Sequence, residues 1–271
     1  MSDHGLFGPD SVTWRVNRES VLLLGGGRAL LLQVAHPSVG AGVEQHSGYR
    51  EDPWGRLFRT LDVTGRIVFG DSATVERASR RLRGVHRRVQ GTIADGRTAG
   101  AAYDAADHDL LLWVWATLVE SALLVYTRYV RPLKVADVEA YYEEQKRFLA
   151  ACGAPAETAP ETYADFMAWY DRMVDEVLEV TPAAREVADA ILHPRQFPLP
   201  LRPAFDVLNL ATVGLLPPTL REGYGLSWGP QRERVLGAQT ALVRRLMPAL
   251  PSLVREMPSA RAAGRRLREA A

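Results

Sequence analysis

The chain has 271 residues, of which 47% are hydrophobic and 24% are charged, and its formal net charge is +1. This size and composition describe a globular protein with a large core, and the low net charge gives no overall field that would attract nucleic acid or an anionic membrane. The single cysteine, Cys152, excludes an internal disulfide framework and a cysteine-based metal site. We therefore expect a cytoplasmic protein without a nucleic-acid partner.

The N-terminal residues 1–15 contain neither the basic region nor the apolar stretch of a secretory signal peptide. We expect them to form a tail in which His4 is solvated. One helical catalytic domain is expected to follow over residues 16–271.

Three consecutive glycines, Gly25 to Gly27, separate two apolar runs. Their spacing fits neither the dinucleotide-binding fingerprint nor the P-loop, so nucleotide binding is disfavoured. The pattern favours a helix whose glycines allow a neighbouring helix, or a flat cofactor, to approach closely. Pro37 should end or kink this helix after His36, because proline lacks the backbone N–H donor.

Two histidines and a carboxylate, His36, His46 and Glu44, lie close together in the next segment. If the chain bends at Gly40 and Gly42, these side chains could form a non-haem iron site of two histidines and one carboxylate, which we keep as a minor alternative. The favoured interpretation is that the histidines hydrogen-bond to buried backbone or face the edge of a flat cofactor.

A helix is predicted to begin at Asp52-Pro53, with the aspartate as N-cap and the proline as first helical residue. It carries Arg56, Arg59 and Thr60 at positions i, i+3 and i+4, so the three side chains leave from one face. They would form one wall of a pocket or, in the alternative interpretation, lie on the surface.

Another helix is predicted over residues 72–93, because apolar residues recur there in steps of three and four. The stripe contains Val75, Ala78, Leu82, Val85, Val89 and Ile93. His86 lies at its edge. An inward-facing histidine in this position is either a hydrogen-bonded core residue or a ligand to a metal.

The segment from residue 110 to residue 130 is apolar almost all round, which predicts the most buried helix of the fold. It is not expected to span a membrane, because only about ten apolar residues precede Glu120 and a span needs roughly twenty. A buried Glu120 would need a partner, for which an arginine is the obvious candidate. Thr117 and Trp115 could border a pocket, although Trp115 equally fits core packing.

The rest of the chain reads as further helices, without strand-like alternation or internal repeats. We therefore expect an all-α fold: a single globular domain of about nine to twelve helices around a buried cofactor pocket. The arginine-rich segment from residue 259 is expected to be a solvated face rather than a membrane-surface anchor. Nothing in the sequence indicates the oligomeric state.

Four ordered motifs carry a resemblance to a known family. They are HPSVGAGVEQHSGYREDPWGRLFRT at 36–60, FG at 69–70, VHRRVQG at 85–91 and ADHDLLLWVWATLVES at 106–121. Together they resemble the haem-dependent oxygenases that include the rubber-cleaving latex-clearing proteins and the oxygenase of mycophenolic acid biosynthesis. The resemblance extends over roughly residues 15–250.

This resemblance implies a haem b cofactor whose proximal iron ligand matches His86. Arg56, Arg59 and Thr60 match an Arg-x-x-Lys-Thr cluster on the opposite, catalytic side of the haem. Arg59 stands at the lysine position, and a guanidinium that stays protonated is a poor iron ligand. His36 and Trp115 are expected as further contacts to the cofactor, and Trp115 stands where many relatives have a histidine.

The implied function is a haem-dependent oxygenase that uses O₂ to oxidise or cleave an apolar, unsaturated, isoprenoid-like small molecule. Two alternatives remain open. One is a haem-binding sensor or carrier without turnover, and the other is a helical interaction protein without a cofactor.

Overall fold

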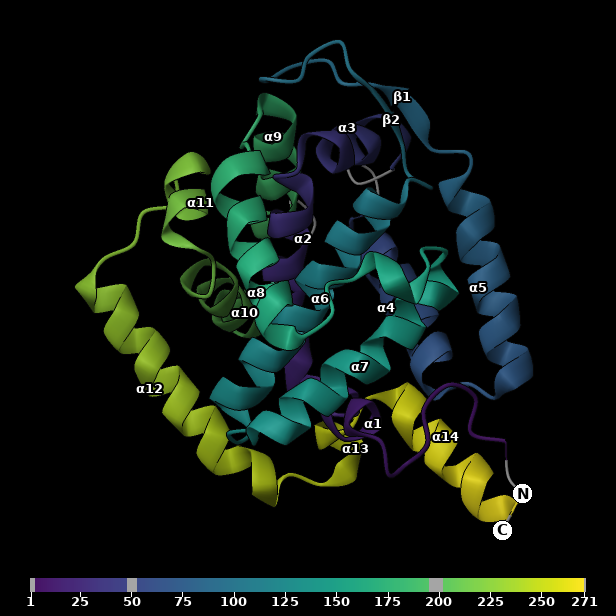
Figure 1. The fold of residues 1–271 in the computed structure, drawn as a ribbon. Coiled ribbons are helices and arrows are strands. Elements are labelled where there is room, and N and C mark those ends of the chain that lie inside the picture. Colours follow the sequence, from purple (N-terminus) through teal and green to yellow (C-terminus); the bar gives the residue numbers. More distant parts are fainter. Residues whose placement is uncertain (1–2, 48–52, 195–201, 271) are drawn as a thin grey trace.

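The computed structural model describes residues 3–47, 53–194 and 202–270, with the side chains of residues 53–58 and 204 outside the description. The described chain is almost entirely helical (Figure 1). Its α-helices are α1 (Val12–Asn17), α2 (Gly26–Val34), α3 (Pro37–His46), α4 (Pro53–Phe69), α5 (Ser72–His86), α6 (His108–Tyr129), α7 (Val135–Cys152), α8 (Tyr163–Arg172), α9 (Pro182–Leu192), α10 (Arg202–Gly214), α11 (Pro218–Gly223), α12 (Pro230–Leu246), α13 (Ser252–Arg255) and α14 (Pro258–Glu269). The expected all-α class is thus confirmed, and the described residues contain fourteen α-helices rather than nine to twelve because several are only one or two turns long.

Helix α6 is the central element, and α2, α7 and α12 pack around it (Figure 1). Trp113, Ala116 and Val125 on α6 are fully buried, as the apolar character of the segment on all sides predicts. Among the described residues it is also the one helix long and apolar enough to cross a membrane, but 61% of its apolar stretch is buried inside the protein. Its position is that of a core helix.

Helix starts follow the side chains that cap them. The Asp71 carboxylate accepts a hydrogen bond from the backbone N–H of Thr74 at 2.7 Å, which fixes the start of α5. At α8, Thr162 and Asp165 form a reciprocal capping box. Each interaction satisfies a backbone donor that the first helical turn leaves unpaired.

Helix α5 ends at His86, seven residues before the predicted end at residue 93. A two-stranded antiparallel hairpin follows, formed by β1 (Gln90–Thr92) and β2 (Ala102–Asp104), with Gly91 opposite Tyr103. Val85, near the C-terminal end of α5, is 51% exposed. The predicted apolar stripe therefore does not continue to residue 93 as one face of a helix. The prediction of a helix over the whole segment was therefore wrong at its C-terminal end, because Ile93 is buried through the hairpin instead.

The N-terminal segment differs from the expected tail. Phe7 and Trp14 are buried in the main core, and the Trp14 ring meets Phe69 edge-to-face with centroids 5.0 Å apart. Residues 3–15 are consequently packed against the domain, and α1 begins before residue 16.

The consecutive glycines lie where the short 3₁₀ helix η1 (Ser20–Gly25) continues into α2. A Cβ on Gly25 would stand 3.0 Å from a methyl of Val125 on α6, and a Cβ on Gly27 would stand 2.4 Å from the Thr212 hydroxyl on α10. The interpretation of close helix approach is confirmed. No strand or phosphate loop is formed in this segment.

We predict that Gly27→Ala destabilises the protein by about 1–3 kcal/mol, because three atoms of buried Thr212 lie within 3.2 Å of the added methyl. Gly26→Ala is the matched control, since nothing lies within 4 Å of its added Cβ. Urea unfolding followed by circular dichroism measures both. Equal stability of the two variants would contradict the close packing.

Candidate functional site

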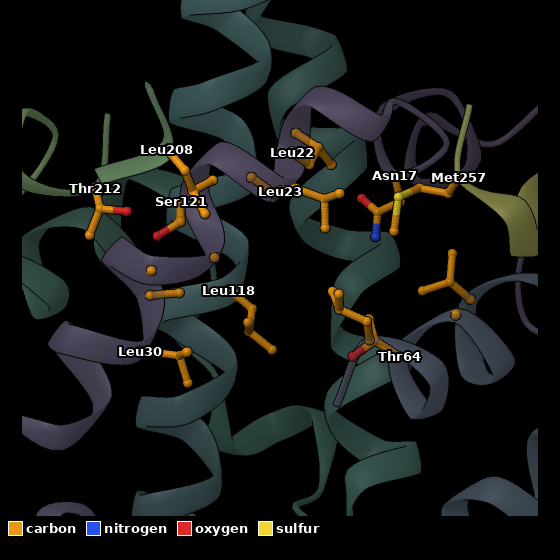
Figure 2. Close-up of a pocket in the computed structure, with 18 of the residues that line it drawn as sticks. Asn17, Leu22, Leu23, Leu30, Thr64, Leu118, Ser121, Leu208, Thr212 and Met257 are labelled. Carbon is orange, nitrogen blue, oxygen red and sulfur yellow. The ribbon is translucent and has the colours of Figure 1, made fainter. Parts of the chain in front are cut away.

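An apolar cavity of about 390 Å³ lies beside the three glycines (Figure 2). Its walls come from α1, η1 and α2, from α4, α6 and α7, and from α9, α10 and α14. Figure 2 shows Leu22, Leu23, Leu30, Leu118 and Thr64 around it. Its described lining contains no Asp, Glu, Lys, Arg or His side chain, so the cavity favours an uncharged, apolar occupant.

The polar side chains of this lining are largely occupied by protein partners. The Tyr141 hydroxyl donates to Asn17 Oδ1 at 3.0 Å, and Asn209 Nδ2 donates to the Leu192 carbonyl at 2.8 Å. Burial raises the pKa of Tyr141, so its hydroxyl stays neutral at physiological pH. The cavity therefore presents mainly hydrocarbon to an occupant.

A buried arginine stands directly behind this wall. The Arg28 guanidinium pairs with the Glu120 carboxylate and also donates to the Ser121 hydroxyl at 2.7 Å and to the Leu215 carbonyl at 2.6 Å. The Tyr170 hydroxyl lies 3.4 Å from the same carboxylate. The predicted arginine partner of Glu120 is thus confirmed as Arg28, and Ser121, which lines the cavity, is fixed by it.

His86 is the last residue of α5 and is partly buried. Its Nδ1 atom is buried and has no hydrogen-bond partner among the described residues. Burial lowers the pKa of the imidazole because it disfavours the charged form. A neutral imidazole with an unused nitrogen is the protonation state that a metal ligand requires.

His36 stands at the N-cap of α3 in a similar environment. Its Nδ1 is also buried without a partner among the described residues, and burial lowers its pKa to about 4. Its ring lies 6.4 Å from the Trp113 ring, centroid to centroid. His36 also borders a second, polar cavity of about 650 Å³, whose lining includes Asp104 and Asp107.

The non-haem iron alternative finds no assembled ligand set. Within the described parts of the chain, no three His, Cys, Asp or Glu side chains are grouped so that they could hold a metal ion. His46 is exposed and its Nε2 lies 3.0 Å from the Gln90 carbonyl oxygen, away from such a role.

The expected distal residues lie on α4. Arg59 and Thr60 are exposed, and the side chain of Arg56 lies outside the described residues. The next residues on α4, Leu61 and Thr64, line the apolar cavity. The cavity lining on α4 therefore begins one residue beyond the Arg-x-x-Arg-Thr cluster. Four of the predicted site residues do not border the cavity: His36, Arg59, Thr60 and His86.

Trp115, the further expected cofactor contact, lies in the aromatic core. Its indole N–H donates to the Gln145 carbonyl at 2.9 Å, and its ring packs against Phe166 and Tyr142. It borders neither cavity. The structure thus places Trp115 as a packing residue between α6, α7 and α8.

Sequence reasoning did not identify the apolar cavity, although α4 carries a readable signal for it. Leu61, Thr64, Gly65 and Val68 are spaced i, i+3, i+4 and i+7, and all four line the cavity. In sequence, such a stripe cannot be told from one that packs in a filled core. The signal that points to a cavity is Gly25 to Gly27, which line the same space and have no side chains to fill it.

The residues present fit a haem ligand in one respect that the structure itself shows. His86 offers a neutral imidazole with a buried, unpartnered nitrogen, and His36 offers a second one. Thirteen buried side-chain polar atoms of the described residues lack a hydrogen-bond partner, and these two imidazole nitrogens are the histidine atoms among them, so the property is compatible with a bound group without requiring one. The fold and these features define an all-α protein that combines a neutral apolar chamber with two partly buried, neutral histidines.

Comparison with known proteins identifies the family. The family described as ER-bound oxygenase mpaB/B'/Rubber oxygenase, catalytic domain, matches residues 14–250. The chain belongs to this family, which confirms the resemblance drawn from the motifs. Uncharacterized proteins of Mycobacterium tuberculosis (Rv2237) and Mycobacterium bovis (Mb2261) are each 27% identical over 210 residues, covering 76% of this chain and 80% of the relative. No solved structure matches the chain.

The lowered pKa of His36 predicts a pH dependence of stability. Between pH 6.5 and about pH 4 the unfolded chain binds a proton at this residue and the folded chain does not, so the free energy of unfolding falls as pH falls. The contribution is at most about 3 kcal/mol. In His36→Gln this part of the slope should disappear.

Urea unfolding of the cofactor-free protein at a series of pH values measures the effect, as the difference between wild type and variant. His108→Gln, at an exposed position, is the control and should leave the slope unchanged. A slope that is identical in His36→Gln and wild type would contradict the assigned burial of the neutral ring.

Proposed function

We propose that this protein is a haem b-dependent oxygenase that oxidises or cleaves a neutral, apolar, unsaturated small molecule with O₂. Membership of the oxygenase family supports the reaction class. The observation that carries the haem assignment is the buried, unpartnered Nδ1 of His86 at the position that resembles the family's proximal ligand.

When bound, haem would supply the redox chemistry that allows O₂ to attack a carbon–carbon double bond. His86 would hold the iron as a neutral ligand, which its lowered pKa favours. Arg56, Arg59 and Thr60, which match the family's catalytic cluster, would provide N–H and O–H donors. Such donors stabilise negative charge that develops on oxygen in a reaction.

The apolar cavity supports the substrate class. Moving a carboxylate or phosphate into a chamber without a countercharge would cost several kcal/mol, so ionised lipids are poor candidates. A neutral isoprenoid-like hydrocarbon would lose only its unfavourable contact with water. Leu61 and Thr64, which line this chamber, directly follow the Arg-x-x-Arg-Thr cluster along α4, which supports the proposed role of that cluster.

We predict that His86→Ala abolishes retention of haem and leaves the helical circular dichroism unchanged, because the variant removes the only proposed iron ligand. The measurement is the haem-to-protein ratio after purification. His46→Ala, at an exposed histidine, should keep the wild-type ratio. Undiminished haem in His86→Ala would remove the assignment, and haem-free wild type would favour a cofactor-free interaction protein.

Arg59→Ala is expected to retain haem but to slow O₂ consumption by roughly tenfold to a hundredfold with an unsaturated isoprenoid substrate, because a charged donor is lost. Arg66→Ala, another exposed arginine of α4, is the control. Unchanged turnover in Arg59→Ala would exclude its role. A wild-type protein that holds haem but consumes no O₂ would favour a sensor or carrier.

A further inference from the structure

Large apolar side chains are exposed mainly on one set of adjoining elements. Among the described residues nine such side chains are exposed, and seven of them lie on η1, α10, α12 and α13. We call these seven the C-terminal apolar face: Leu23, Val207, Val235, Leu242, Leu246, Leu253 and Val254. Concentrated exposure of this kind marks an interaction surface more often than scattered single residues do.

Helix α12 forms the centre of this face and runs along the edge of the molecule (Figure 1). Val235, Leu242 and Leu246 are spaced i, i+7 and i+11, so they form one stripe, and they are 51%, 58% and 49% exposed. By contrast, Leu236 is the one buried residue of the helix. The stripe is thus a second apolar side of α12, separate from the side that packs on the core.

The remaining members adjoin this helix. Gln239 of α12 donates to the Val207 carbonyl of α10 at 3.1 Å, which places Val207 beside the stripe. After α12, the short helix η5 (Met247–Ala249) leads to α13, where Leu253 is 70% exposed. Helix α13 in turn contacts η1, which carries Leu23.

Charge is strongly segregated toward the same part of the chain. Residues 230–271 contain nine arginines and three glutamates and no lysine or aspartate, which gives +6. The whole chain carries +1, so residues 1–229 carry −5. Arg234 and Arg245 are exposed on α12 and lie along one side of the apolar stripe on the helical wheel. The near-neutral total charge conceals this asymmetry.

The face is continuous with the apolar cavity. Leu23 is 40% exposed and also lines the cavity, and Met257, which follows α13, lines it too (Figure 2). An apolar molecule held against the C-terminal apolar face would therefore meet a cavity wall at Leu23.

We propose that α12 and α13 dock on an anionic lipid bilayer, with the apolar stripe in the interface and the arginines against the headgroups. Exposed apolar residues beside arginines are the combination that binds a helix in the plane of a membrane surface. A second copy of the chain is a poorer partner, because it would bring two like-charged segments together: residues 230–255, from α12 to α13, contain five arginines and one glutamate, which gives +4. Nucleic acid would use the charge but not the apolar stripe.

Docking in this way places Leu23 and the cavity wall at the lipid surface. A neutral apolar substrate dissolved in the bilayer could then reach the cavity without crossing water. This delivery rests on the proposed function, whereas membrane docking itself does not.

The test is cosedimentation of the full chain with phosphatidylcholine vesicles that contain about one third phosphatidylglycerol. We expect wild type to bind these vesicles and to bind pure phosphatidylcholine far less. The triple variant Leu242→Ser, Leu246→Ser, Leu253→Ser should weaken binding at least about tenfold. Arg234→Gln with Arg245→Gln should weaken it by roughly the same factor and reduce its salt dependence.

Val135→Ser is the matched control, because Val135 is 80% exposed but lies on α7 outside the face. It should bind as wild type does, and so should His86→Ala, since docking does not depend on haem. Absence of wild-type binding, or equal binding by the triple variant, would overturn the proposal. A dimer in solution that the triple variant abolishes, without vesicle binding, would show that the face joins two copies of the chain.

Discussion

The buried guanidinium of Arg28 is the constraint on which the interior of this protein depends. It joins α2 to Glu120 and Ser121 on α6 and to the Leu215 carbonyl just after α10. A buried charge is tolerated only when its partners are in place, so these segments cannot shift independently. The three glycines lie directly before Arg28, and their closeness to α6 and α10 depends on the same arrangement. The apolar cavity is the space that remains between these fixed helices and α4.

The described structure contains two chemically different environments. On one side of α4 the cavity has a lining without ionisable acidic or basic side chains, which suits a neutral hydrocarbon. Nearer the hairpin, His86 and His36 are held neutral by burial, with ring nitrogens that no described residue uses. The Arg-x-x-Arg-Thr cluster on α4 lies between the cavity-lining residues and the N-terminal end of that helix. The cavity and the two histidines are therefore separate parts of the described structure, because neither histidine borders the cavity.

The sequence predicted those features that depend on local pattern. The apolar surface of α6 on all sides identified the central helix, and a glutamate within it demanded an arginine. The sequence could not identify Arg28 as this arginine, because Arg28 and Glu120 are 92 residues apart and only the packing of α2 against α6 brings them together. The hairpin after His86 was missed because its strands have only three residues each, too short for a period-two pattern.

The same distinction applies to the site. The resemblance to the oxygenase family singled out His86 and the α4 cluster. A cavity, by contrast, is formed by several helices at once, and Leu61 or Val68 looks like any core residue in sequence. The segregation of charge was likewise hidden in a total of +1. A cavity or a charged surface that is formed by segments distant in the sequence cannot be predicted from local sequence patterns.

The central claim is that a neutral histidine at the end of α5 binds a haem. The most direct measurement is the visible absorption spectrum of the full-length protein purified from cells supplied with haem precursor, together with quantification of iron porphyrin. The account predicts an intense Soret band and one haem b per chain. A colourless protein that also fails to bind added haem would contradict it.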